Sequence, residues 1–323
     1  MTGATLFANP ASEGSFWFPP QASTGAEAVD FAYNFIFWVS VVSFVVVVVL
    51  MLFFALRYRR KAKGELPPKK TASHNTVLEV GWSLPVAITG GILFYLGAVS
   101  FLDSRSPPSD AYEISVKAMK WAWSFTYPNG YTAPNLHAPA GRPVRLVMSS
   151  DDILHSLYIP AFRLKQDVVP GRYTQVWFEA KEPGEYQIFC TEYCGTKHSE
   201  MLAKAVIQTP EDFTRWLDDA SNVLDRLAPD EAGKQIFSAR GCVACHSTDG
   251  RAGVGPSLLG VFGKTRKFAD GTTTTADENY IRNSVLNPAS QVVEGFNPVM
   301  PSFQGSLKDK EIDAIIAYIK TLK

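Results

Sequence analysis

Two long uncharged runs occupy the N-terminal third of the chain. Phe31 to Leu56 and Val80 to Leu102 hold no charged side chain and are rich in Phe, Val, Leu and Ile. At about 1.5 Å per helical residue, both runs can cross the roughly 30 Å hydrocarbon core of a bilayer. The pattern therefore predicts a transmembrane hairpin over residues 31–103, preceded by an N-terminal segment of residues 1–30.

A cluster of basic residues separates the two runs. No Lys or Arg comes before this cluster, whose members are Arg57, Arg59, Arg60, Lys61, Lys63, Lys69 and Lys70. The positive-inside rule places such a loop in the cytoplasm, so residues 1–30 and everything after Asp103 are expected outside. A secretory signal peptide would carry a basic stretch before its apolar run, and the first run has none.

Residues 110–209 show short β-branched and aromatic runs separated by turn residues. Turn signals such as Pro170-Gly171 and Pro183-Gly184 separate the runs, as expected for chain reversals. Several short strands at this spacing are typical of a β-sandwich or barrel. The runs that we expect to form strands are Tyr112–Val116, Val144–Met148, Thr174–Phe178 and Tyr186–Phe189.

The pattern after this domain is helical. Residues 210–227 are polar and are interpreted as a helical linker, and residues 228–323 as a last domain. The final helix is expected over Lys308–Leu322. Its apolar side chains recur at helical spacing, which is typical of a helix that packs one face on a core; they are Ile312, Ile315, Ile316 and Ile319.

Charge and motifs exclude several classes of function. The chain has 31 basic and 31 acidic residues and a formal net charge of +0, so bulk charge does not indicate a nucleic-acid-binding protein. It has no P-loop, G-x-S-x-G or H-E-x-x-H motif, so hydrolytic chemistry has no candidate residues. Its only four cysteines form two close pairs, each followed by a histidine. The sulfur chemistry is therefore confined to two local sites.

The first pair lies in a segment rich in soft metal ligands. Cys190, Cys194, His198 and Met201 fall within a dozen residues, and His155 lies upstream. Thiolate, thioether and imidazole together favour copper, and two thiolates can bridge two copper ions. Two other interpretations remain open, namely a disulfide and a Cys2His2 zinc site with both histidines. Neither uses the methionine.

The second pair forms a C-x-x-C-H motif, the signature of covalent c-type haem attachment. Cys242 and Cys245 would bond the haem, and His246 would ligate its iron. A thioredoxin-like pair would need a βαβ context, and a zinc site would need further ligands. Met300 is the only methionine after Met201 and is the expected sixth iron ligand, a pairing that raises the haem potential.

At these positions the chain resembles a known family. The segment Cys190–Met201 resembles the copper-binding loop of cytochrome c oxidase subunit II, and the similarity extends from about Phe31 to Thr209. The last domain resembles small class I cytochromes c. Together they resemble subunit II of caa-type oxidases, in which a cytochrome c is fused to the copper subunit. Further matching segments are His74–Pro85, Lys120–Trp123, Ser150–Ser156, Ile159–Phe162 and Val169–Arg172.

The resemblance implies a multidomain membrane protein: a two-helix transmembrane hairpin, a cupredoxin-like β-barrel and an all-α cytochrome c domain. It implies a dinuclear CuA-type centre, with Trp121 where electrons enter, a magnesium ion near the Glu192 side chain, and Glu79 at a proton-uptake entrance. Ala122 departs from the family, because many members carry a third aromatic residue in this patch. The implied copper ligands are His155, Cys190, the Glu192 carbonyl, Cys194, His198 and Met201.

The implied function is to pass electrons from haem c through copper to haem in subunit I, where oxygen is reduced with proton translocation. Neither span carries a histidine, so oxygen chemistry is not expected on this chain. The implied partners are subunits I and III, an upstream cytochrome c or quinol-oxidising complex, and the lipid of a bacterial cytoplasmic membrane, with both metal domains on the periplasmic side. The alternatives are the corresponding subunit of a copper-containing nitric oxide reductase and a stand-alone tethered electron carrier.

Overall fold

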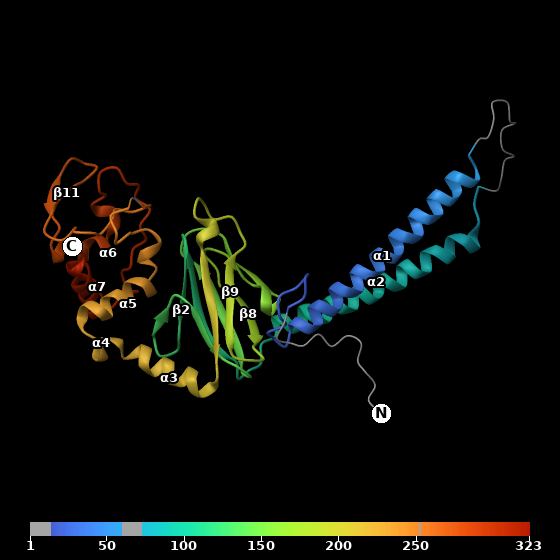
Figure 1. The fold of residues 1–323 in the computed structure, drawn as a ribbon, viewed down its shortest axis with the longest axis horizontal. Coiled ribbons are helices and arrows are strands. Elements are labelled where there is room, and N and C mark those ends of the chain that lie inside the picture. The colour runs from blue at the N-terminus through green and yellow to red at the C-terminus, as the bar shows by residue number, and fades with distance from the viewer. Residues whose placement is uncertain (1–13, 60–72, 252) are drawn as a thin grey trace. The chain divides into compact units, whose positions relative to one another are not determined.

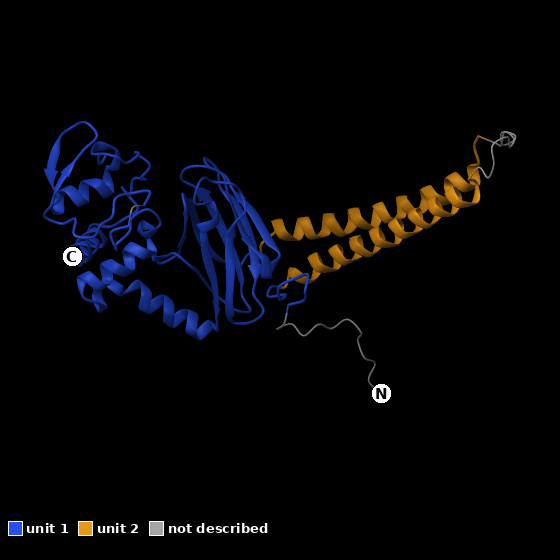
Figure 2. Ribbon diagram, turned by 45° about the horizontal axis from the view of Figure 1, so that its top comes forward, with its two compact units in different colours: residues 1–23, 108–323 blue, residues 24–107 orange. Residues whose placement is uncertain are grey.

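The computed structural model describes residues 14–59, 73–251 and 253–323. The chain divides into two compact units (Figure 2), one of residues 24–107 and one of residues 1–23 and 108–323. Most of the basic loop and the start of the N-terminal segment lie outside the described residues, at 60–72 and 1–13.

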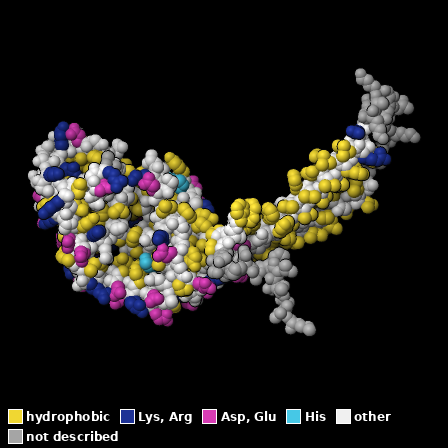
Figure 3. Space-filling view, in the orientation of Figure 1, with side chains coloured by type: hydrophobic (Ala, Val, Ile, Leu, Met, Phe, Trp, Pro, Cys, Tyr) yellow, Lys and Arg dark blue, Asp and Glu magenta, His cyan; other side chains and the backbone are white. Residues whose placement is uncertain are grey.

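The smaller unit is a pair of long helices, α1 (Ala26–Arg57) and α2 (Thr76–Arg105). Their mean hydropathies, 3.1 and 1.8 over the most apolar stretch, make both long and apolar enough to cross a membrane. Apolar side chains cover their exposed surface, as Figure 3 shows in yellow. A capping interaction starts α2, because the Asn75 side chain accepts a hydrogen bond from the Leu78 amide, which satisfies one of the free donors of the first turn.

The larger unit begins with a β domain of two five-stranded sheets (Figure 1). One sheet has the order β3-β2-β1-β5-β8 and the other β4-β10-β9-β6-β7. Strands alternate buried and half-buried positions, as in β5, so each sheet gives one apolar face to a shared core. The strands are β1 (Tyr112–Met119), β2 (Ala122–Thr126), β3 (Thr132–Ala133), β4 (Leu136–Pro139), β5 (Pro143–Ser150), β6 (His155–Ile159), β7 (Leu164–Val168), β8 (Thr174–Glu179), β9 (Gly184–Cys190) and β10 (Leu202–Gln208).

Two helices follow this domain, α3 (Pro210–Ser221) and α4 (Val223–Arg226). The first packs on the β domain through aromatic side chains: Phe213 is buried, and Trp216 stacks on His137 with ring centroids 3.8 Å apart. His137 is half-buried under this ring. The helical segment is therefore attached to the β domain through α3, whereas side chains of α4 pack against the core of the helical domain that follows.

The last domain is helical and has a core of its own. Its two longest helices cross closely, because a Cβ added at Gly233 would lie 1.8 Å from the Ala314 carbonyl oxygen. Only glycine permits this approach. One short hairpin interrupts the helical pattern. The elements of this domain are α5 (Pro229–Ala239), α6 (Glu278–Leu286), α7 (Asp309–Thr321), β11 (Thr265–Lys267) and β12 (Thr273–Thr275), with the 3-10 turns η3 (Cys242–Ala244) and η4 (Pro288–Ser290). The β domain has the 3-10 turns η1 (Pro160–Phe162) and η2 (His198–Glu200).

The fold class expected from sequence is confirmed: two apolar helices, a β domain and a helical domain follow one another along the chain. All four predicted strand segments lie within observed strands, and the final helix differs by one residue at each end.

Candidate copper and haem sites

Strand pairing brings His155 to the first cysteine pair. Strands β6 and β9 are antiparallel neighbours in which Leu157 lies opposite Cys190. Side chains two residues apart in a strand point to the same face, so His155 shares the face of Leu157 and lies near Cys190. Its side chain is fully buried, and its Nδ1 is 3.9 Å from the Cys190 sulfur.

The other candidate ligands lie in the connection between β9 and β10. The Cys190 amide donates to the Met201 carbonyl at 3.3 Å, which holds the two ends of this loop together. Within it, the Cys194 sulfur is 3.8 Å from the Cys190 sulfur, 3.4 Å from His198 Nδ1 and 3.9 Å from the Met201 sulfur. The Glu192 carbonyl is 3.3 Å from the Cys190 sulfur. All six expected donors thus face one small volume.

The two thiols have opposite acidities. Burial acts to raise the pKa of Cys190, but hydrogen bonds to His155 and to backbone groups lower it to about 6. Burial, and then the neighbouring Cys190 charge, raise the pKa of Cys194 to about 12. Because a thiolate is the form that binds metal, the protein alone stabilises one charged sulfur and leaves the second proton to be displaced when metal binds.

Asp152 orients His155. Its carboxylate lies 2.8 Å from His155 Nε2, so Nδ1 faces the sulfur cluster. Burial acts to lower the pKa of His155, but Asp152 and Cys190 raise it to about 9. Carboxylate-to-histidine contacts of this kind fix the ring orientation at metal sites. The neighbouring acidic residue, Asp151, contacts Lys117 instead.

The donor set distinguishes among the three interpretations of this cluster. The sulfurs are 3.8 Å apart and both cysteines are free, whereas a disulfide requires about 2.05 Å. His155, Cys190 and Cys194 offer ligand atoms within 4.8 Å of one another, which alone would suit zinc or copper. The Met201 thioether is fully buried beside Cys194. Thioether is a ligand that copper accepts and structural zinc sites do not use, so the residues fit copper.

Trp121 contacts the copper loop directly. Its indole nitrogen donates a hydrogen bond to the Cys194 carbonyl at 3.1 Å. Its ring lies against Gly195, where an added Cβ would be 3.1 Å from the ring. Gly195 also has φ +118, a region that favours glycine. The residue expected where electrons enter is therefore one hydrogen bond from a candidate copper ligand.

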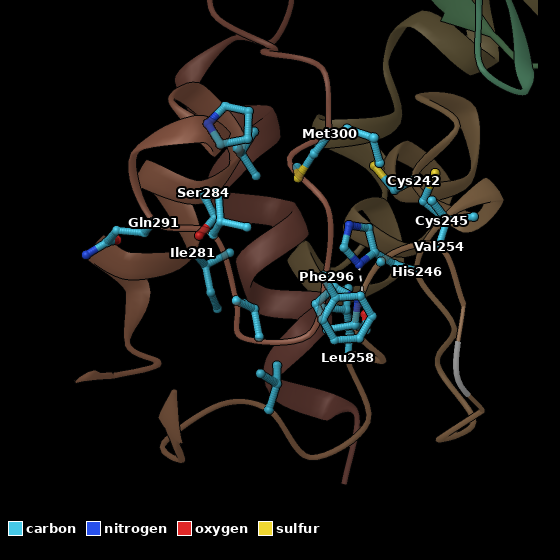
Figure 4. Close-up of a pocket in the computed structure, with 18 of the residues that line it drawn as sticks. Cys242, Cys245, His246, Val254, Leu258, Ile281, Ser284, Gln291, Phe296 and Met300 are labelled. Carbon is cyan, nitrogen blue, oxygen red and sulfur yellow. Dashed lines mark hydrogen bonds between the residues drawn. The ribbon is translucent and has the colours of Figure 1, made fainter. Parts of the chain in front are cut away.

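The second cysteine pair lines an apolar pocket of the helical domain (Figure 4). Cys242, Cys245, His246 and Met300 all line it, among side chains from α6, α7 and the loop before Met300. Burial raises the pKa of both thiols, that of Cys242 to about 12, so this pocket disfavours the thiolate form, in contrast to the surroundings of Cys190. The pocket suits a flat apolar group rather than a charged metal–thiolate site.

The His246 ring is held with one nitrogen free for the pocket. Its Nδ1 donates to the Pro256 carbonyl at 2.8 Å, and burial lowers its pKa, which favours the neutral imidazole that binds iron. Gly255 permits this packing, because an added Cβ would lie 2.7 Å from the ring. The residues present therefore fit a haem bound through His246 and Met300.

Comparisons with known proteins agree with this geometry. Family models for the cytochrome c oxidase subunit II transmembrane domain and periplasmic domain match residues 11–102 and 131–209. The cytochrome c oxidase subunit 2 of Alkalihalophilus pseudofirmus is 30% identical over 303 residues, covering 90% of this chain and 86% of that protein. The chain belongs to the cytochrome c oxidase subunit II family. A cytochrome c family model matches residues 231–323, so a cytochrome c domain is fused to the subunit.

Two further comparisons cover part of the chain. The cytochrome c oxidase subunit 2 of a Synechocystis species is 30% identical over 250 residues, covering 62% of this chain and 74% of that protein. Among solved structures, the periplasmic domain of subunit II from Bradyrhizobium japonicum is 24% identical, with a TM-score of 0.35, covering 36% of this chain and 98% of that one.

The family resemblance also gave roles to the side chains of two acidic residues. Glu79 accepts a hydrogen bond from the Asn75 amide at 3.1 Å and lies 3.1 Å from His74 Nδ1, so it caps the start of α2. Glu192 is half-buried, with its carbonyl turned to the copper cluster. The proton-uptake and magnesium roles of these two side chains stay predictions.

Several supporting residues were missed by reasoning from sequence. The Pro256 carbonyl, the Trp216 stack and the contact of Lys197 with the haem-attachment turn all depend on tertiary structure. Of these three features, only the Trp216 stack is indicated by the sequence. Phe213, Trp216 and Leu217 recur at helical spacing, which is typical of a helix that packs on a core.

Proposed function

We propose that this subunit receives electrons for a respiratory terminal oxidase and transfers them to subunit I. Membership of the family makes it part of a haem–copper oxidase complex with that catalytic subunit. The path that we propose runs from haem c to a dinuclear CuA-type centre and then to haem in subunit I, for reduction of oxygen to water coupled to proton translocation. When bound, both groups supply one-electron chemistry without change of protein ligands.

The buried cluster of donors around Cys194 is the observation that carries this proposal. Two sulfurs 3.8 Å apart, with a histidine beside each and a buried thioether, have the composition of a site for two copper ions. The chain's own residues exclude water here, since His155, Cys194 and Met201 are almost fully buried. A rigid, dry site changes little when an electron arrives, which favours rapid transfer.

The residues assigned to each group are those expected from sequence. The copper ions would be held by His155, Cys190, the Glu192 carbonyl, Cys194, His198 and Met201. Haem c would be held by Cys242, Cys245, His246 and Met300. Trp121, bonded to the Cys194 carbonyl, would be the point at which electrons enter the copper domain.

The wider assembly follows from the same proposal. Both metal domains would lie on the periplasmic side of a bacterial cytoplasmic membrane, spanned by α1 and α2. Subunit III, a magnesium ion near Glu192 and proton uptake near Glu79 would complete the complex. A cytochrome c or a quinol-oxidising complex would supply electrons to haem c.

Copper counting on the purified complex tests the proposal. Metal analysis and low-temperature electron paramagnetic resonance are expected to find a spin shared by two copper nuclei, with two such coppers for each haem c. A single localised copper, or zinc, at this site would contradict it. Turnover with oxygen against nitric oxide separates the oxidase from a nitric oxide reductase, and recovery of this chain without a large haem-bearing subunit would identify a stand-alone carrier.

A further inference from the structure

The copper loop and the haem-attachment turn touch within the larger unit. Lys197, between Cys194 and His198 in the copper loop, donates a hydrogen bond from Nζ to the Ala244 carbonyl at 3.0 Å. Ala244 lies between Cys242 and Cys245. The Lys197 side chain is 30% exposed, so the bond is partly shielded from solvent. A charged donor bound to a carbonyl in such a setting is among the stronger hydrogen bonds.

A second contact lies beside Trp121. Gly241, the residue before Cys242, approaches Ala122 so closely that an added Cβ would lie 2.9 Å from the Ala122 Cβ. Carbon atoms normally pack at about 3.5–4.0 Å. The methyl group of Ala122 therefore leaves space for the turn, and a larger side chain there would push the turn away.

The two contacts of the haem-attachment turn involve the copper loop and the neighbour of Trp121. Trp121 bonds the Cys194 carbonyl, and its neighbour Ala122 touches the residue before Cys242. Ala122 is also the position at which this chain lacks the third aromatic residue of the family's patch. The absent aromatic ring and the close approach of the haem-attachment turn occur at the same place.

We propose that Ala122 and Lys197 form a docking site for the chain's own cytochrome domain. Ala122 admits the turn that carries Cys242 and Cys245, and Lys197 holds it through the Ala244 carbonyl. Both are positioning residues, and they set the separation of donor and acceptor. Transfer of one electron would oxidise ferrous haem c to the ferric state and reduce the copper centre by one electron, with no bond made or broken. This inference rests on the proposed function.

The contact also selects the donor. A tethered domain is present at high effective concentration, but the tether alone does not decide how it binds. A small residue at position 122 favours the fused domain, whose Gly241 complements it. A diffusing cytochrome would find the docked turn in contact with Ala122, the neighbour of Trp121, and with Lys197 of the copper loop, so external donors are expected to reduce haem c rather than the copper directly.

Time-resolved reduction of the assembled, metal-loaded complex tests this inference. Haem c is reduced by a light pulse from a bound photosensitiser, and the electron is followed to copper by absorbance. A122Y is expected to slow this transfer about tenfold or more, the size of an overpacking effect on the docked population. A122S, nearly the same size as alanine, is the matched control and is expected to keep the wild-type rate.

The lysine contact is tested by substitution and conservative rescue. K197Q is expected to slow transfer by about fivefold, as for loss of a charge-assisted hydrogen bond, and K197R to restore most of the rate. K204Q, which removes a lysine that pairs with Glu185 on the same domain, is the control for charge and should have no effect. Hydrogen–deuterium exchange of residues 239–246 should increase in A122Y and K197Q alone.

The outcomes separate this inference from the proposed function. If electrons reach copper in the wild type but A122Y transfers at an unchanged or higher rate, with unchanged exchange, the docking site is wrong and the proposed function stands. If reduced haem c in the wild type passes no electron to copper, the proposed function itself fails. Unchanged copper resonance and haem absorbance in each variant show that the cofactor sites are intact.

Discussion

The copper cluster and the haem pocket hold their ligands in different ways. In the β domain the donors already touch, within a wall of buried strands, so the protein alone specifies the site. In the helical domain the four expected haem residues line a shared apolar pocket, and its walls come from separate helices and loops. A packed core loses stability when such a space is not filled. The difference suggests that copper is added to a formed domain, whereas haem helps to form its own.

Removing haem attachment tests this difference most severely. In a Cys242→Ala, Cys245→Ala double variant, we expect the cytochrome domain to lose its cooperative unfolding transition, because a bound cofactor stabilises only the folded state. The β domain should keep its transition. Calorimetry and limited proteolysis of the full chain would measure both. A double variant whose cytochrome domain melts like the wild type would contradict the comparison.

Removing a copper ligand should have the opposite consequence. Cys194→Ser is expected to lower copper affinity by more than about 100-fold, since it deletes a ligand rather than a supporting group. It should cost the β domain only about 1 kcal/mol of unfolding free energy, a typical cost of one substitution. Metal content and denaturant unfolding measure the two effects. Collapse of the β domain in this variant would show that copper is needed for its fold.

A substitution at the crossing of α5 and α7 measures how much helix packing contributes to the stability of the cytochrome domain, besides the contribution of haem. Gly233→Ala places a methyl group where the Ala314 carbonyl oxygen lies, so the helices must separate. The expected loss of unfolding free energy is about 3 kcal/mol, at the upper end for overpacking. Thermal unfolding followed by haem absorbance would report it. Ala232→Gly, at the neighbouring buried position, is a control that makes space without a clash.

The contact of Asp152 with His155 tests whether the β domain itself orients a copper ligand. Asp152→Asn keeps the shape but weakens the orientation of the ring, and we expect copper affinity to fall about 10- to 100-fold. Asp151→Asn is the matched control, because Asp151 contacts Lys117 and not the cluster. Copper competition titrations would compare them. Equal affinities in the two variants would rule out the orienting role.

The smallest expected effect concerns the stability of the β domain at low pH. Burial under Trp216 lowers the pKa of His137 from its ordinary value of 6.5. As pH falls below about 6.5 the unfolded chain takes up a proton before the folded one. Stability should therefore decrease until the folded-state pKa is passed. His137→Gln is expected to flatten this dependence between pH 7 and 5, in melting temperatures measured for both proteins.

Reasoning from sequence identified the metal ligands better than the groups that orient those ligands. Cys190–Met201 and Cys242–His246 are contiguous, so their residue types indicate metal chemistry before any fold is known. His155 lies far from the cysteines in sequence and was included as an upstream imidazole, and the pairing of β6 with β9 explains why it lies at the copper site. The Pro256 carbonyl that orients His246 carries no signal, because every residue has a carbonyl group.

The sequence by itself determined the two spans, the order of the domains and the kinds of ligand, because these depend on composition and on spacing within short segments. Tertiary structure alone decided which residues meet across long separations. No pattern in the sequence indicates the Lys197–Ala244 bond, the approach of Gly241 to Ala122 or the crossing at Gly233. Such contacts depend on how strands and helices pack, and packing is a property of the whole core rather than of any one segment.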